Sequence, residues 1–186
     1  IGDVLWRRQL FQRDAGAEMI KAAFDHRAFA GAAVLGPHAG LHRRQGRAGR
    51  DDIAAHARDF LQKTKILFAL SSFDNLIKNG RIHRLTGMLA KALGIWGIGS
   101  GSDEGKIAFE SKARGAKKVV HTLVSTMKEH GFIGGNVAIS HCDNLALAQT
   151  LKNSILDIWE NTSIEILPTR GLCSYYAERG GLIVSY

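Results

Sequence analysis

Apolar residues follow two kinds of spacing along the chain from residue 51 onward. Short runs rich in apolar residues predict buried strands. They occupy residues 65–70, 95–98, 106–111, 136–140, 163–167 and 182–186. Two longer segments, 116–130 and 145–160, repeat apolar residues at helical spacing and predict amphipathic helices. Strands that alternate with helices of this length indicate an α/β fold, in which helices pack on a sheet.

The helix expected over 145–160 has one apolar face. That face carries Leu147, Leu151, Ile155 and Ile158. Shorter helices are predicted over 51–64, 73–78 and 85–93. Asn79 and Gly80 follow the second of these and form a good helix stop, because glycine accepts the left-handed conformation that often ends a helix.

Residues 1–50 differ from the rest of the chain. A helical pattern is present at 4–24, but 30–50 is rich in glycine, alanine and arginine and has little periodicity. A long stretch without secondary structure is uncommon inside a compact domain. We therefore interpret 1–50 as a remnant or a linker, and 51–186 as the α/β domain. The first residue is Ile1 rather than methionine, which fits a trimmed or incomplete amino terminus.

The formal net charge of +8 and the pI of about 9.8 raise the question of nucleic-acid binding. The densest basic cluster, at 42–50, has no aromatic residues between its arginines. Proteins that bind single-stranded nucleic acid stack the bases on aromatic rings. The pattern therefore argues against a nucleic-acid partner and favours solvated surface charge.

The number of cysteines and the hydropathy of the sequence indicate the cellular compartment in which the protein is expected. Cys142 and Cys173 form no disulfide framework and have no metal-binding spacing. No apolar stretch approaches the roughly 18 residues of a membrane span, and no signal peptide opens the sequence. We expect a cytoplasmic protein without stable membrane insertion.

A glycine-rich segment, Gly97 to Gly101, precedes Lys106 and suggests a phosphate-binding loop. The Walker motif needs Gly-x-x-x-x-Gly-Lys followed by Ser or Thr. Here Ser100 stands at the first glycine position, and Ile107 follows the lysine. We therefore favour a glycine-rich hairpin between two strands. A small-molecule kinase or transferase that uses Lys106 is kept as a rival hypothesis.

His141, Cys142 and Asp143 place three reactive side chains at the end of a predicted strand. Adjacent strand residues point to opposite faces, so the three cannot all converge on one substrate. Asp143 or Asn144 is expected to cap the helix that follows. The eight histidines lack ligand spacing, so we expect no metal site.

Two polar segments remain as candidate binding sites. The strand at 65–70 leads through serines and a short helix to Arg81, whose guanidinium either holds a polar ligand or neutralises a helix end. The closing segment offers the hydroxyls of Ser174, Tyr175 and Tyr176 beside two glycines that permit close backbone approach. The simpler interpretation of that segment is a helical connection that packs Tyr175 against the core.

Four segments, in this order and spacing, resemble the DegV family of fatty-acid-binding proteins. They read ILFALSSFDNLIKNGRI, GKIAFESKARGAKKVV, NVAISHCDNLALAQTL and LPTRGLCSYYAERGGLIVSY. The resemblance covers residues 51–186 and matches the C-terminal half of the family. It implies the C-terminal part of a two-domain α/β protein that encloses one long-chain fatty acid in an apolar tunnel.

The resemblance also implies roles for particular residues. Gly80-Arg81-Ile82 matches the family's Gly-Arg-Ile, whose arginine lies near the ligand's head group. We therefore predict Arg81 and Ile82 as ligand contacts, together with the closing segment's hydroxyl residues, Ser174, Tyr175 and Tyr176. Tyr176 stands where many members carry a histidine, so the site loses a side chain that can become cationic.

Bacterial members of the family present the bound acid to a fatty acid kinase, which phosphorylates the carboxyl group for phospholipid synthesis. The resemblance therefore implies a carrier rather than an enzyme, with a long-chain fatty acid as ligand, no cofactor, and the kinase's catalytic subunit as partner. Residues 1–50 lack the loop with which the family's N-terminal domain holds the carboxyl group. A structural fragment that needs a missing N-terminal domain is therefore a second rival hypothesis.

Overall fold

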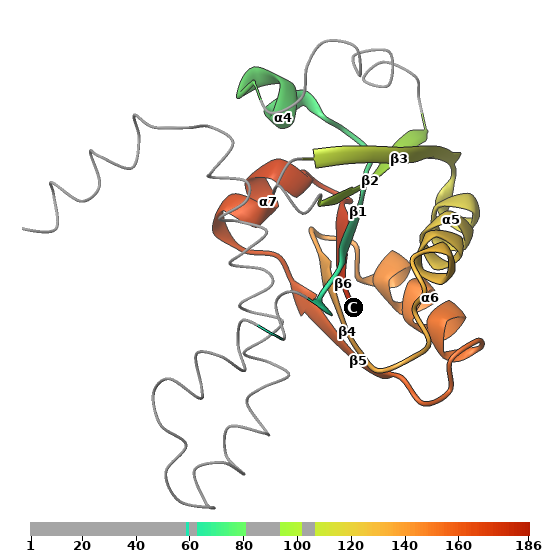
Figure 1. Ribbon diagram of the computed structural model, residues 1–186. Helices are drawn as coiled ribbons and strands as arrows, with labels where there is room; N and C mark the ends of the chain where they lie inside the picture. Colours follow the sequence, from blue (N-terminus) through green and yellow to red (C-terminus); the bar gives the residue numbers. More distant parts are fainter. Residues whose placement is uncertain (1–58, 60–62, 81–93, 102–106) are drawn as a thin grey trace, which may run out of the picture.

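The computed structural model describes residues 59, 63–80, 94–101 and 107–186 (Figure 1). In chain order, the elements are β1 (Ile66–Leu70), α4 (Asp74–Lys78), β2 (Ile95–Gly101), β3 (Ile107–Arg114), α5 (Ala116–Glu129), β4 (Asn136–His141), α6 (Leu145–Leu156), β5 (Ser163–Pro168), α7 (Gly171–Ala177) and β6 (Leu182–Ser185). The predicted α/β class is confirmed, and every predicted strand is present. β2 and β3 each end three residues later than the sequence pattern indicated.

Within the described residues, six strands form one sheet in the order β3-β2-β1-β6-β4-β5. β4 and β5 are parallel and are connected through α6, whereas the other neighbouring pairs are antiparallel. The closing strand β6 lies between β1 and β4, so Ile183 is paired with Phe68 on one side and with Ser140 on the other. The end of the chain is thereby built into the centre of the sheet, beside the strand that leads toward Arg81.

One face of the sheet, the first face, is covered by α5 and α6 (Figure 1). α5 buries Leu123 and Met127, and α6 buries Leu151 and Ile155, against strand residues that include Val184. These residues recur every three or four positions, which places them on one side of each helix. Fully burying a side chain of this size is worth about 1.5–3 kcal/mol. The first face therefore contains the main core of the described chain.

The opposite face, the second face, carries the two short helices α4 and α7 (Figure 1). A smaller hydrophobic cluster lies beneath them. Its buried members are Leu70, Phe73, Leu76, Tyr176 and Ala177. Since this cluster contains residues from the end of β1 and from both helices, it holds α4 and α7 on the sheet.

β2 and β3 are consecutive and antiparallel, as the predicted hairpin between two strands requires, but the glycine-rich segment up to Gly101 lies inside β2 and not in the connection between the strands. A side chain at Gly97 would overlap the ring of Phe73. A side chain at Gly99 would overlap the ring of Phe68 and the backbone of Ala108. The two glycines therefore make room for phenylalanine rings. Glycine within a strand often marks the close approach of another group. The local sequence pattern did not show which group approaches here, because the two rings lie far away in the chain.

The helix predicted over 145–160 is shorter in the structure, because α6 ends at Leu156. The first three residues of its predicted apolar face are buried, but Ile158 is 54% exposed, which corrects that assignment. The chain turns after α6, and Trp159 packs edge-on against Phe132 with ring centroids 5.0 Å apart. Because of this turn, Trp159 packs against the core and Ile158 is left exposed.

The short helix predicted before Asn79 is α4, and Gly80 follows it with a φ of 65°, in the left-handed region expected after a helix. The helices predicted at 4–24, 51–64 and 85–93 fall outside the described residues, apart from residues 59, 63 and 64. The division into 1–50 and 51–186 therefore stays a prediction. Within the described part of the chain, no helix is long and apolar enough to cross a membrane.

Candidate functional site

α7 carries three of the predicted ligand contacts. Tyr176 is only 8% exposed and belongs to the second-face cluster, whereas Tyr175 is 45% exposed. The expectation that Tyr175 packs against the core is therefore wrong, and its neighbour occupies that position. Adjacent residues of a helix are separated by about 100°, so only one of the two rings can point fully into the cluster. The second ring is left at the surface of α7.

Ser174 faces the segment that precedes α7. Its hydroxyl donates a hydrogen bond to Thr169 Oγ1 at 2.9 Å. Its carbonyl oxygen accepts the backbone N–H of Glu178 at 3.1 Å and lies 3.8 Å from Cys142 Sγ. A ligand carboxylate would therefore have to compete with Thr169 for the Ser174 proton.

Two asparagines of the α4 segment hold Tyr175 by its backbone and by its phenol. Asn75 Nδ2 donates to the carbonyl oxygen of Tyr175 at 2.8 Å. Asn79 Nδ2 donates to the Tyr175 hydroxyl oxygen at 3.0 Å and to the carbonyl oxygen of Asn75 at 2.8 Å. Asn79 and Tyr175 are 96 residues apart in the sequence, so these contacts join two distant parts of the chain.

This contact brings α7 close to the start of the predicted Arg81 segment. Asn79 stands two residues before Arg81 in the sequence. Arg81 and Ile82 themselves lie outside the described residues. The structure thus brings Tyr175 together with the end of α4, and a shared site with Arg81 and Ile82 stays a prediction.

The Tyr175 phenol is suited to an anionic ligand. Its oxygen accepts a hydrogen bond from Asn79, and the phenol keeps its own proton, which it can donate. An ionised carboxylate can only accept hydrogen bonds, and bonds to it are roughly twice as strong as those between neutral groups. The end of α7 can therefore offer a directed donor to an anionic head group.

The three reactive residues around the end of β4 have different partners. His141 Nδ1 accepts the backbone N–H of Asn144 at 3.2 Å, and Asp143 accepts a hydrogen bond from Arg179 Nε at 2.7 Å. Cys142 packs against the second-face cluster. The structure therefore gives no common target for these side chains. Within the described residues, no group of three or more His, Cys, Asp and Glu side chains could hold a metal ion.

Asn144 occupies the N-cap position of α6, as one of the two predicted caps, but its side chain makes no capping hydrogen bond. Its Nδ2 instead donates to the carbonyl oxygen of Gly180 at 2.7 Å. The side chain therefore ties the start of α6 to the segment between α7 and β6. The Asn144 side chain thus donates to a distant carbonyl oxygen, whereas the predicted cap would have accepted a local backbone N–H.

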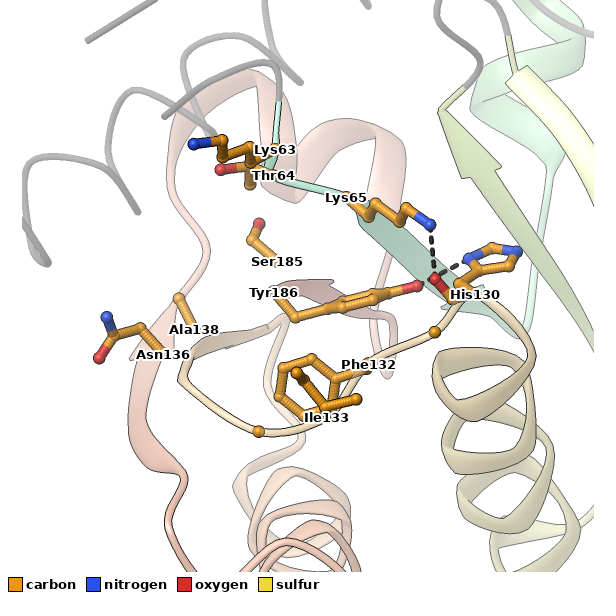
Figure 2. Close-up of a pocket in the computed structure, with 12 residues that line it drawn as sticks. Lys63, Thr64, Lys65, His130, Phe132, Ile133, Asn136, Ala138, Ser185 and Tyr186 are labelled. Atoms are coloured by element: carbon orange, nitrogen blue, oxygen red, sulfur yellow. Dashed lines mark hydrogen bonds between the residues drawn. The ribbon is translucent and has the colours of Figure 1, made fainter. Parts of the chain in front are cut away.

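A cavity of about 290 Å³ lies at the opposite end of β1 from α4 and α7 (Figure 2). Figure 2 shows Lys65 Nζ donating to the carbonyl oxygen of His130, at 2.6 Å, beside the 2.7 Å contact between His130 Nδ1 and the Tyr186 hydroxyl. Burial raises the pKa of the Tyr186 phenol well above its usual value, and the negative charge of Glu110 adds to the shift. These contacts hold the end of α5 against the ends of β1 and β6.

The sequence did not predict this cavity, because its lining comes from separate segments, at 63–65, 130–138 and 185–186. A signal that could have drawn attention to it is the glycine cluster after α5. Gly131 and Gly134 adopt φ values of 80° and 107°, which let the loop turn at the cavity's edge.

Family membership follows from comparison with known proteins. The DegV family model, described as "Uncharacterised protein, DegV family", matches residues 25–186. The chain belongs to the DegV family. A DegV domain-containing protein of Streptococcus pyogenes is 35% identical over 136 residues, which cover 73% of this chain and 49% of the relative. Another, of Streptococcus pneumoniae, is 39% identical over 127 residues, which cover 68% of this chain and 45% of the relative.

Solved DegV structures share the fold. A DegV family protein from Eubacterium eligens, loaded with heptadecanoic acid, matches with a TM-score of 0.75 and 33% identity over 82% of this chain and 55% of that one. The Streptococcus pneumoniae Fatty Acid Kinase (Fak) B3 protein, loaded with linoleic acid, matches with a TM-score of 0.70 and 37% identity over 73% and 48%. The chain thus spans about half the length of its DegV relatives.

Proposed function

We propose that this DegV chain binds a long-chain fatty acid as a carrier and presents its carboxyl group to a fatty acid kinase. The observation that carries the proposal is that two proteins of the same fold, at 33% and 37% identity, are loaded with heptadecanoic and linoleic acids. Each ligand combines a carboxyl group with a long acyl chain. A site for such a molecule needs polar donors at one end and an apolar wall along the rest.

The proposed head-group site consists of Arg81 and Ile82 with Ser174, Tyr175 and Tyr176. A guanidinium suits a carboxylate because its paired donors match the two oxygens, and a buried carboxylate is costly without such partners. The Tyr175 phenol supports the assignment, since it has a proton to donate and contacts the segment that leads to Arg81. Tyr176 would contribute by packing, because its ring is buried in the second-face cluster.

The acyl chain is assigned to the second face of the sheet. Phe68, Phe73 and Ile183 contribute apolar side chains to that face. Each methylene removed from water is worth about 0.8 kcal/mol, so a long acyl chain supplies most of the binding free energy. Affinity would therefore depend mainly on this wall, and the orientation of the ligand on the head-group residues.

The proposed partner is the catalytic subunit of a fatty acid kinase. Support comes from the Streptococcus pneumoniae protein named Fatty Acid Kinase (Fak) B3, which has the same fold. The relatives from Streptococcus pyogenes and Streptococcus pneumoniae are bacterial. We accordingly propose a cytoplasmic carrier in bacterial phospholipid metabolism, with no catalysis and no cofactor of its own.

The rival kinase or transferase hypothesis depends on Lys106 and on the glycine-rich segment before it. Lys106 lies outside the described residues. The hypothesis gains no support from β2, since Gly97 and Gly99 face phenylalanine rings. The carrier proposal accounts for those rings as part of an apolar wall.

Native mass spectrometry of the full chain, followed by identification of any released molecule, tests the proposal. We expect a bound long-chain fatty acid in the wild-type chain and a weakened or lost complex in Arg81→Ala. Arg179→Ala is the matched control, because Arg179 is an exposed arginine that pairs with Asp143. This control should keep the ligand.

Three other results would contradict the proposal in different ways. A chain that stays free of lipid after incubation with fatty acids is not a carrier by itself. A chain that takes up lipid only when the other half of a DegV protein is added is a structural fragment. A chain that binds a nucleotide and no lipid supports the kinase or transferase hypothesis.

A further inference from the structure

Glu178 follows α7 in a backbone conformation that is unusual for its residue type. Its φ is 52°, in the left-handed region where residues other than glycine are uncommon. Such a conformation is unfavourable and persists only where the surrounding contacts hold it. The contacts of Glu178 should therefore show which interactions hold this conformation.

The carboxylate of Glu178 is directed at α4. Its Oε1 accepts the backbone N–H of Asn75 at 2.9 Å in a partly buried position. That N–H belongs to the first turn of α4, where no carbonyl of the helix is available to it. Phe73, at the N-cap position, makes no side-chain capping bond. Glu178 therefore acts as a cap for α4 from 103 residues away.

This cap is one of several contacts that fix α4 on α7. Asn75 and Asn79 donate to the carbonyl and hydroxyl oxygens of Tyr175, respectively. The contacts involve both ends of α4, so they restrict its position and its rotation. α4 has only five residues, and a helix of that length has little stability of its own. Its placement therefore depends on these contacts.

We infer that Glu178 is a positioning residue for the proposed head-group site: its carboxylate fixes α4, and α4 through Asn79 fixes the Tyr175 hydroxyl. The inference rests on the proposed function. Glu178 is not a ligand contact, because its negative charge would repel a fatty acid carboxylate. Removing the carboxylate should weaken recognition of the acid head group while leaving the apolar wall unchanged.

The test compares the affinities of the full chain for palmitic acid and for hexadecanol, which share an acyl length and differ in the head group. Glu178→Ala should lower the affinity for palmitic acid about tenfold and that for hexadecanol by less than about twofold. Glu178→Gln keeps an acceptor oxygen and should retain the wild-type ratio of the two affinities. Glu178→Gly removes the carboxylate and relieves the strained φ. It should therefore lower the affinity for palmitic acid relative to that for hexadecanol, even where the alanine variant folds poorly.

The possible outcomes separate the inference from the function on which it rests. Equal losses for acid and alcohol in both the alanine and glycine variants would show a purely structural effect and overturn the positioning role. Unchanged affinities for both molecules in both variants would overturn it as well. A wild-type chain that binds neither molecule would overturn the proposed function, and the role of Glu178 with it.

Discussion

The two faces of the sheet are held together by different kinds of interaction. On the first face, α5 and α6, of 14 and 12 residues, bury aliphatic side chains against the strands. On the second face, α4 and α7, of five and seven residues, cover a smaller cluster and are joined by asparagine and glutamate side chains. Stability on the first face comes mainly from apolar area, whereas the second face adds a few directional hydrogen bonds to its smaller apolar cluster.

This difference separates stability from recognition. An intramolecular hydrogen bond contributes only about 0.5–1.5 kcal/mol net, but it fixes direction as well as distance. A hydroxyl such as that of Tyr175 can therefore be held in one orientation by contacts that add little to global stability. Binding elements are commonly drawn from regions of low local stability. The second face has the shorter helices and the smaller buried cluster, and the predicted ligand contacts in the described residues lie there.

The largest expected effect is on the first face. Leu151→Ala should lower the free energy of unfolding by about 2–5 kcal/mol, because Leu151 is fully buried and its removal leaves a cavity. Urea denaturation of the variant and the wild-type chain measures the change. Ile158→Ala is the control, since Ile158 is exposed, and should change stability by less than about 0.5 kcal/mol. Similar effects of the two substitutions would remove the basis for a main core on this face.

A smaller loss is expected where β2 meets the second-face cluster. Gly97→Ala places a methyl group against the ring of Phe73 and should cost about 1–3 kcal/mol by overpacking. Combining it with Phe73→Leu should give a total loss smaller than the sum of the two, because each change relieves the other. Denaturation of both single variants and the double variant measures this coupling. Strict additivity would show that the ring does not limit the side chain at this glycine.

Tyr175→Phe should have a modest effect on stability and a clear one on ligand preference. The variant loses the oxygen that accepts from Asn79 and the proton that can be donated to an anion. We expect a loss of about 0.5–1.5 kcal/mol in the free energy of unfolding, together with weaker binding of a fatty acid than of the matching alcohol. Calorimetric titration with both ligands checks this prediction. An unchanged preference would exclude Tyr175 from the head-group site.

The smallest effect concerns the cavity at the other end of β1. The raised pKa of Tyr186 means that the unfolded chain releases this proton near pH 10 while the folded chain keeps it. The corresponding stability is present below pH 10 and is lost as the pH rises above it. The difference in unfolding free energy between the wild-type chain and Tyr186→Phe should therefore decrease between about pH 9 and pH 11. A difference that does not change with pH would contradict burial of the phenol.

Local patterns were sufficient for most elements of the fold. The apolar spacing of α5 and α6 predicted their buried faces, apart from Ile158, because a helix that covers one face must repeat its apolar residues at 3–4 positions. The short apolar runs located every described strand. The place of β6 between β1 and β4 could not be obtained in this way, because strand order depends on contacts between distant segments.

The same limit applies to the candidate site. Ser174, Tyr175 and Tyr176 were selected by residue type and family resemblance, but the pattern assigned the buried position to the wrong tyrosine. The contacts of Asn79 and Glu178 with distant residues had no local signal. The close approach of phenylalanine rings to Gly97 and Gly99 could not be predicted for a similar reason, since those rings belong to other elements.

Carbon NMR of the full chain, mixed with palmitic acid that is isotopically labelled at its carboxyl carbon, tests most directly whether Tyr175 contacts the head group of a bound fatty acid. We expect one bound carboxylate resonance, in slow exchange with free acid, that moves in Tyr175→Phe and stays in place in Arg179→Ala. The bound carboxylate should also remain ionised at a pH where the free acid is protonated, because donors stabilise its charged form. A spectrum that contains only free palmitic acid, or a bound signal that is indifferent to Tyr175, would contradict the account.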